Sequence, residues 1–520
     1  MRAKASFWLL TGYLNGSNIV YRNTYFLRKE MHMKTIDREM TGAVKRPVKV
    51  VQFGEGNFLR GFVDYMIDIA NEKGVFDGSV VLVKPIPFGS LEHFHQQQCQ
   101  YTVSLRGIVD GEAQVLNRQI SSVADAVDCY EEYDKYMALA ELDTLRFVVS
   151  NTTEAGIVYD ETDSFEAMPP KSFPGKLTQF LYHRFETFKG AMDKGLVMLP
   201  VELIDDNGIM LKKCVLQLAQ RWQLGEAFIQ WLEQTCVFTS TLVDRIITGY
   251  PRDNEQAEWE QLGYEDRCLV TGEPFALWVI ESDKDISGEL PLPRAGLPVI
   301  YTDNQKPYKQ RKVRILNGAH TSFVLASYLA GNDYVKESME DELICQFMMD
   351  TLFKEVIPTL TLPKAELEEF ARAVITRFNN PYVKHALLAI SLNSVSKWRA
   401  RCMPSFLGYV EQQGGLPVHL TFSLAALMAF YSSTELCEDA LIGHREGQEY
   451  RIQDDRAVLE FFKDYSDKDE LTFVKAFLGR EDFFGQDLNQ IDGLTEAVAG
   501  YLAEIRTMGM REALCKNFSK

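Results

Sequence analysis

The sequence has few features of proteins that act on membranes or nucleic acids. No run of 18 apolar residues occurs in its 520 residues, so we expect no membrane-spanning helix. Positive charge is also scarce, because 55 lysines and arginines stand against 73 aspartates and glutamates, for a net charge of −18. This balance argues against nucleic acid as a partner and against docking on anionic membranes. It does not exclude a small anionic substrate, since a few local cations can bind one.

Metal-binding and disulfide patterns are missing as well. The sequence contains no H-E-x-x-H motif, no zinc-spaced Cys/His cluster and no P-loop, so we predict no metal site. Its nine cysteines are scattered, odd in number and never spaced as C-x-x-C. This usage fits reduced thiols better than a disulfide framework, and we predict a cytoplasmic protein.

The length of the chain requires more than one hydrophobic core, so two or three domains are expected. Residues 1–32 differ in character from the rest. Their apolar run stops at Thr11 and Gly12, which is too short for a secretion signal. We expect this segment to be a non-native or disordered extension, with the natural start at Met31 or Met33.

The first half of the chain alternates between strand and helix patterns. Residues 48–53 form a short apolar, β-branched run typical of a buried parallel strand. A glycine turn, a helical pattern and a second apolar run at 79–85 complete a β-α-β unit. Further strands are predicted at 101–107, 146–151 and 195–203, and helices at 125–142, 174–193 and 208–222. The alternation favours an α/β class with a Rossmann-like, doubly wound sheet.

The second half of the chain reads mainly as helix. One strand is predicted at 298–303. The helices are predicted at 317–330, 338–357, 364–376, 382–402, 420–432, 455–464, 469–478 and 493–509. We therefore place a dinucleotide-binding domain at 46–245 and a mainly α-helical substrate or catalytic domain at 246–520.

The glycine turn after the first strand is the candidate cofactor site. Gly54 and Gly56 match the first two glycines of the dinucleotide fingerprint, but Leu59 replaces the third and Gly61 comes two residues late. The turn opens a helix, whose free N–H groups favour a pyrophosphate, and Arg60 offers a further phosphate contact. The alternative is a plain strand–helix turn. The predicted site comprises Val50, Val51, Gln52, Phe53, Gly54, Glu55, Gly56, Asn57, Phe58, Leu59, Arg60, Gly61 and Asn151.

The residues that follow two of the predicted strands indicate how a cofactor would be bound. Asn151 follows the strand at 146–151, where ligands collect in such sheets, so we expect it near the nicotinamide ribose. The second strand ends in Lys84 and Pro85, without the acidic residue that usually binds the ribose. This position therefore does not decide between NAD and NADP.

Residues 312–320 bring three proton-handling side chains together. Lys312, Asn317 and His320 stand at i, i+5 and i+8, which on an α-helix fall at roughly 0°, 140° and 80°. All three would face one cleft with His320 in the middle. A buried lysine can act as general acid or base, while an amide and an imidazole can polarise a carbonyl. The alternative is a helix start with a chance lysine and a buried histidine.

Three motifs together resemble the polyol-specific long-chain dehydrogenases, the mannitol dehydrogenase family. They are GxGxFxR at 54–60, VDRI at 243–246 and KxxxxNxxH at 312–320, and longer phrases extend the likeness from about residue 48 to the C-terminus. The resemblance implies NAD-dependent, metal-independent, reversible reduction of the keto-uronate D-tagaturonate to the aldonate D-altronate in hexuronate catabolism. It also implies that Lys312 is the catalytic acid/base and that Asn317 and His320 bind the carbonyl.

The substrate pocket follows in part from the same resemblance, which implies that Asp244 belongs to it. A uronate also carries a carboxylate, so its pocket needs a cation. The candidate cations are Arg377, Lys384 and Lys397, and the candidate hydroxyl-binding residues are Asn380 and His385. Each of them could instead be a solvated helix charge or a structural cap.

Several rival functions stay open at this point. The same chemistry could serve fructuronate and mannonate, or a neutral polyol such as mannitol. A non-catalytic NAD-binding protein and a structural partner protein with a closed cleft are rivals of another class. The sequence does not indicate an oligomeric state.

Overall fold

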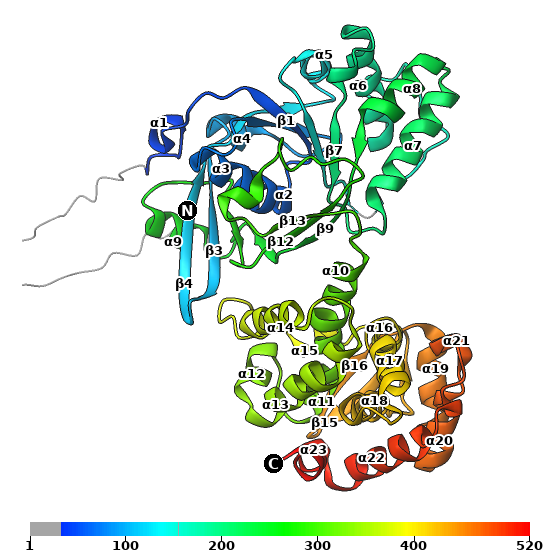
Figure 1. Ribbon diagram of the computed structural model, residues 1–520. Coiled ribbons are helices and arrows are strands. Elements are labelled where there is room, and N and C mark those ends of the chain that lie inside the picture. The colour runs from blue at the N-terminus through cyan, green and yellow to red at the C-terminus, as the bar shows by residue number, and fades with distance from the viewer. Residues whose placement is uncertain (1–32, 154, 520) are drawn as a thin grey trace, which may run out of the picture.

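The computed structural model describes residues 33–153 and 155–519, which form two bodies joined near helix α10 (Lys306–Arg311) (Figure 1). The first body holds a six-stranded parallel sheet and two smaller sheets, and the second is mainly helical. This confirms the predicted α/β class with a Rossmann-like N-terminal part and a helical C-terminal part. The strands of the first body continue to Thr302, and the domain boundary after residue 245 stays a prediction. The prediction for residues 1–32 lies outside the described residues.

The six-stranded sheet has the order β5-β2-β1-β6-β7-β8, with every neighbouring pair parallel. Its strands are β1 (Val48–Phe53), β2 (Ser79–Lys84), β5 (Val123–Asp128), β6 (Phe147–Ser150), β7 (Val197–Pro200) and β8 (Val237–Phe238). The chain moves outward in one direction from β1 to β5 and in the other from β6 to β8. The crevice at the carboxyl ends of β1 and β6 is therefore the switch point, where such sheets bind ligands.

Two of the predicted elements differ in the structure. The first part of the predicted helix at 125–142 is wrong, because Val123–Asp128 is the edge strand β5, and helix α5 occupies only Tyr133–Ala138. Apolar residues at 123, 126 and 127 fit a helix as well as a strand, and pairing with β2 decides between them. The predicted strand at 101–107 forms as β3 (Tyr101–Val109), but in a separate sheet of order β10-β11-β3-β4. The other strands of that sheet are β4 (Glu112–Ile120), β10 (Ile247–Gly249) and β11 (Val270–Gly272).

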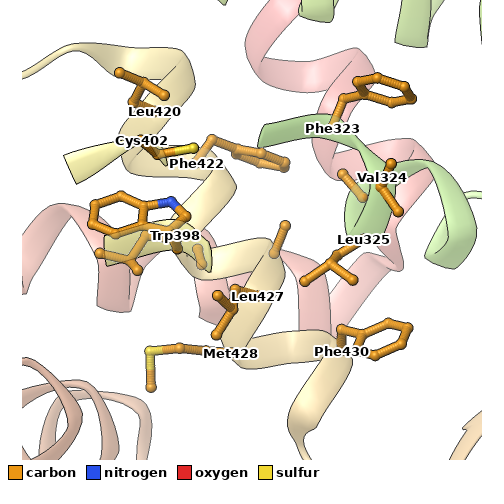
Figure 2. Close-up of a cluster of buried hydrophobic side chains, with 14 of the residues drawn as sticks. Phe323, Val324, Leu325, Trp398, Cys402, Leu420, Phe422, Leu427, Met428 and Phe430 are labelled. Carbon is orange, nitrogen blue, oxygen red and sulfur yellow. The ribbon is translucent and has the colours of Figure 1, made fainter. Parts of the chain in front are cut away.

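The helical body is organised around three packed helices, α11 (Gly318–Leu329), α16 (Ser394–Arg401) and α18 (Val418–Tyr431). Figure 2 shows side chains from all three meeting in one cluster, among them Phe323, Trp398 and Phe422, each fully buried. Burial of such aromatic side chains stabilises the fold strongly. Residues on the other faces of α11 and α16 are thereby held at fixed positions.

Most of the remaining predictions for this body hold, but the predicted helix at 338–357 is divided at Asp341 between α12 (Val335–Glu340) and α13 (Glu342–Asp350). Residues 382–386 are not helical, so the predicted helix at 382–402 is wrong there, and α15 (Leu387–Ile390) and α16 take up its later part. A small antiparallel sheet of β14 (Leu436–Cys437), β15 (Ala440–Arg445) and β16 (Gln448–Ile452) was not predicted. All nine cysteines are free thiols. In the described ranges, every helix is too short or too polar to cross a membrane.

Candidate active site

Three adjoining hollows run from the glycine turn into the helical body. The first has a volume of about 910 Å³ and includes Gly54, Gly56 and Asn151 in its lining. The second, of about 780 Å³, shares Asn151 with the first and also contains Lys312. The third, of about 390 Å³, shares Lys312 with the second and contains His320. Lys312 therefore lies at the junction between the hollow that leads to the glycine turn and the hollow in the helical body.

The glycine turn is shaped by its backbone. Gly54 has φ 119°, and a Cβ there would lie 3.2 Å from the backbone oxygen of Asn151, so both conformation and space require glycine. Gly56 precedes helix α2 (Asn57–Leu59), and a Cβ built on it would meet no atom within 4 Å. The turn is thus an open cradle at the start of the helical segment that runs to Glu72. A pyrophosphate group fits such a cradle through backbone N–H groups.

The predicted cofactor residues divide into two groups. Gly54, Glu55, Gly56, Asn57, Phe58 and Asn151 line the first or second hollow. Val50, Val51, Gln52, Phe53, Leu59, Arg60 and Gly61 lie buried beneath the turn and line neither. Arg60 donates to the Glu55 carbonyl at 2.9 Å, to Asn57 Oδ1 at 2.7 Å and to the Cys268 carbonyl. Its guanidinium therefore fixes the turn from below.

Gly61 performs a packing role similar to that of the missing third glycine. It lies in the π-helical turn Arg60–Asp64, and a Cβ there would be 2.7 Å from Ile247 Cδ1 and 3.1 Å from Val270 Cγ1. These two side chains belong to strands β10 (Ile247–Gly249) and β11 (Val270–Gly272). The glycine thus permits a close approach between the helix and the neighbouring sheet.

Lys84, at the end of β2, is withdrawn from the cofactor hollow. Its Nζ lies 2.8 Å from the Ile86 carbonyl oxygen and 2.8 Å from Asp128 Oδ2, and the residue is 1% exposed. The ammonium is thus occupied within the protein and is not offered to the 2′-phosphate that distinguishes NADP from NAD.

Glu202 organises the loop after β6, and sequence reasoning missed it. Its buried carboxylate accepts from the Thr152 backbone N–H and hydroxyl, both at 3.0 Å, and from the Ser150 hydroxyl at 3.1 Å. Burial raises the pKa of Glu202, and these hydrogen bonds oppose the rise. Its place just beyond the end of β7, beside the predicted site at Asn151, was the available signal.

Lys312 begins a π-helical turn, Lys312–Asn317. Hydrogen bonds in such a turn join residues five apart, so Lys312 and Asn317 lie closer to one helix face than the 140° offset of a regular α-helix predicts, and both line the third hollow. The Lys312 ammonium donates to the Val243 carbonyl at 2.8 Å. Burial lowers the pKa of Lys312; the charge of Asp244 opposes this effect and that of Arg377 adds to it. The lysine can therefore be neutral at a lower pH than a free one.

His320 lies in the first turn of α11, and its ring stacks on Phe378 with 4.2 Å between centroids. Among the described residues its Nε2 is buried and has no hydrogen-bond partner. Burial lowers the pKa of His320 well below its usual value, and the nearby cations add to this effect. A neutral imidazole with an unpaired buried nitrogen is suited to a ligand oxygen. Asn317 lines the same hollow, as predicted for a joint carbonyl-binding role.

Asp244 and Arg377 line the third hollow as members of a buried ion triad. Arg377 donates to Asp244 at 3.0 and 3.1 Å and to Glu273 at 2.8 and 3.0 Å. Burial opposes its charge, but the two carboxylates outweigh burial and raise the pKa of Arg377. Because both partners are bidentate, little of the guanidinium is left to bind a substrate.

The other predicted substrate residues are placed unequally. His385 and Lys397 line the third hollow, whereas the exposed Lys384 and the buried Asn380 do not. The Asn380 amide donates to the Arg106 carbonyl at 2.9 Å. Arg401, which sequence reasoning missed, also lines this hollow. It follows Lys397 by four residues on α16, and that spacing on one helix face was the signal that could have found it.

Comparisons with known proteins give matches along nearly the whole chain. The profile of the mannitol dehydrogenase Rossmann domain matches residues 48–294, and that of the mannitol dehydrogenase C-terminal domain matches residues 304–506. Over 489 residues the chain is 46% identical to an altronate oxidoreductase of Escherichia coli O1:K1 / APEC, covering 93% of this chain and 99% of that protein.

Two solved structures share the fold at 21% sequence identity. A substrate-free D-sorbitol dehydrogenase superposes with a TM-score of 0.76 over 92% of this chain and 100% of that chain. The mannitol 2-dehydrogenase of Pseudomonas fluorescens, in a ternary complex with NAD and D-mannitol, gives a TM-score of 0.63 over 94% and 100%.

Proposed function

The chain belongs to the mannitol dehydrogenase family, and on that premise we propose that it is an NAD-dependent oxidoreductase that interconverts D-tagaturonate and D-altronate. One observation is the main support for this chemistry. Lys312, with its pKa lowered by burial, lies where the hollow from the glycine turn meets the hollow that contains His320. A proton and a hydride can therefore be delivered to one carbon–oxygen bond from two sides.

The first two hollows fit the cofactor. The backbone at Gly54 and Gly56 would hold the pyrophosphate, and Asn151, which lines both hollows, would be available to the nicotinamide ribose. The buried Lys84–Asp128 pair supports NAD over NADP, because the lysine at this strand end is already paired and is not available to a 2′-phosphate. NAD, bound there, accepts the hydride in oxidation and NADH supplies it in reduction.

Lys312 handles the proton. During reduction the protonated ammonium, held by the Val243 carbonyl, gives a proton to the substrate oxygen; during oxidation the neutral amine takes it back. Asn317 donates from its amide to the same oxygen, and His320 donates from Nε2 in the tautomer that carries hydrogen there. Because burial lowers the pKa of Lys312, the neutral amine that oxidation needs forms at a lower pH than for a free lysine.

The test is NADH consumption by the purified protein with D-tagaturonate, D-fructuronate and D-fructose. We expect D-tagaturonate to give the highest kcat/KM. A preference for D-fructuronate or for the neutral ketose would replace the proposed substrate by one of its rivals. No turnover with any of the three, despite stabilisation of the fold by NADH, would indicate a non-catalytic NAD-binding protein.

A further inference from the structure

The third hollow contains more positive than negative charge. It is lined by Lys312, Arg377, Lys397 and Arg401, and by one carboxylate, that of Asp244. The Asp244 carboxylate is already bound by Arg377, which Glu273 also neutralises. Within residues 33–153 and 155–519, neither Lys397 nor Arg401 forms a salt bridge. The two residues of α16 therefore have no ion-pair partner in these ranges, and only the charge of Asp454, which is not paired with it, favours the ammonium of Lys397.

The local contacts of these two cations are few. Lys397 Nζ donates to the Ile390 carbonyl at 2.8 Å, and Arg401 Nη1 lies 3.4 Å from the Thr321 hydroxyl. Both residues are half-buried. Burial lowers the pKa of Lys397, repulsion from Arg401 lowers it further, and burial lowers the pKa of Arg401. Holding two like charges together in this way costs free energy, and an anion between them removes that cost.

Their position along the three hollows indicates which part of a substrate they meet. Lys312 lines both the second and the third hollow, whereas Lys397 and Arg401 line the third alone. In D-tagaturonate the ketone lies beside one end of the six-carbon chain and the carboxylate is the other end. With the ketone oxygen at Lys312, the carbon chain extends along the third hollow toward α16.

We propose that Lys397 and Arg401 together bind the substrate carboxylate and so select sugar acids over neutral sugars. The inference rests on the proposed function and deepens it. The planar guanidinium of Arg401, with most of its donors unused, suits a bidentate contact with a carboxylate, and Lys397 adds a point charge. Arg377 is thereby assigned to hold Asp244 and Glu273 in place, and not to bind the substrate.

The experiment compares Arg401→Gln and Lys397→Gln with the wild-type enzyme on two ligands. D-Tagaturonate carries the carboxylate, and D-tagatose, used as a competitive inhibitor, has a hydroxymethyl group in its place. We expect each substitution to raise KM for D-tagaturonate roughly 10- to 100-fold, as for loss of a hydrogen bond between charged groups. The Ki for D-tagatose should change less than about twofold, and Arg401→Lys should recover part of the loss.

Two matched controls lie nearby. Arg399 is exposed on the same helix, and Lys384 is exposed outside the hollow, so Arg399→Gln and Lys384→Gln should leave both constants unchanged. The inference is overturned if Arg401→Gln and Lys397→Gln act no more strongly than these controls. It is also overturned if they raise the D-tagatose Ki as much as the D-tagaturonate KM, which is what general distortion of the pocket predicts.

A separate readout keeps this inference distinct from the proposed function. If the wild-type enzyme does not reduce D-tagaturonate, the proposed function fails. Binding of D-altronate to the enzyme–NADH complex, measured by NADH fluorescence with the same variants, then tests the cation pair by itself. Equal affinity of the wild type and Arg401→Gln for D-altronate would contradict the inference. A lower affinity of the variant for D-altronate, with the controls unchanged, would support it.

Discussion

At the glycine turn the site is made by backbone, whereas in the third hollow it is made by charged side chains. The turn depends on the positive φ of Gly54 and on the close approach of Gly54 to the Asn151 backbone oxygen. Gly54 directly follows β1 and Asn151 directly follows β6. The hollow depends on Arg377, whose partners Asp244 and Glu273 are 133 and 104 residues away. If the cofactor binds at the turn as proposed, backbone groups that no side-chain substitution removes would hold it, whereas the substrate would meet side chains that single substitutions can change.

The largest effect should come from Lys312, the side chain that lines both the second hollow, on the side of the glycine turn, and the third hollow. Lys312→Met removes the proton donor, and we expect kcat to fall roughly a thousandfold in both directions. NADH should still raise the thermal unfolding temperature of the variant, because the cofactor is held by the turn. Near-normal turnover would contradict the assigned role.

The next largest effect should be on stability, at the ion triad. Arg377→Met leaves the carboxylates of Asp244 and Glu273 buried without a partner, which should lower the free energy of unfolding by about 3–5 kcal/mol. Chemical denaturation measures this change. Lys384→Met, which removes an exposed cation, serves as the control and should stay within about 0.5 kcal/mol of wild type. Equal stability of the two variants would show that the triad is not what holds the hollow.

A smaller effect distinguishes the two glycines of the turn. Gly54→Ala places a Cβ 3.2 Å from the Asn151 oxygen at φ 119° and should destabilise the fold by about 1–3 kcal/mol. Gly56→Ala meets nothing within 4 Å and should cost less than about 1 kcal/mol. Thermal unfolding without cofactor makes the comparison, and a larger loss for Gly56→Ala would reverse our description of the turn.

The smallest effect is a shift in pH dependence. Oxidation needs neutral Lys312, so its rate should rise with pH through the lysine pKa, which burial lowers, while reduction falls over the same range. Asp244→Asn removes an attraction that favours the ammonium, so the limb should move to lower pH. Arg377→Met removes a repulsion, so the limb should move to higher pH. Profiles of kcat/KM for D-altronate oxidation measure both shifts, and movement in the same direction would refute the electrostatic account.

The sequence predicts the features that depend on neighbouring residues, and it does not predict those that depend on residues far apart in the chain. Strand β1, the glycine turn and the order of Lys312, Asn317 and His320 are local, and residue spacing was enough to place them. The edge strand β5 could not be separated from a helix, because its buried residues fit both periods until pairing with β2 is known. Arg377 was predicted as a candidate cation for a carboxylate, and its own carboxylate partners could not be recognised because they are distant in sequence. Arg401 follows Lys397 by four residues, but the sequence does not show that this helix face lines the hollow.

The π-helical turn at Lys312–Asn317 has a consequence for how this stretch tolerates change. A π turn contains one residue more than an α-helical turn, so Lys312 at its start and His320 after its end belong to helical turns whose phase differs by that residue. Substitutions within the turn leave the number of residues in it unchanged. Deleting one residue between Lys312 and Asn317 would shorten the turn to an α-helical one and rotate the lysine relative to the histidine, even if the remaining sequence were unchanged. The alignment of Lys312 with His320 therefore depends on the number of residues between them as much as on the types of those residues.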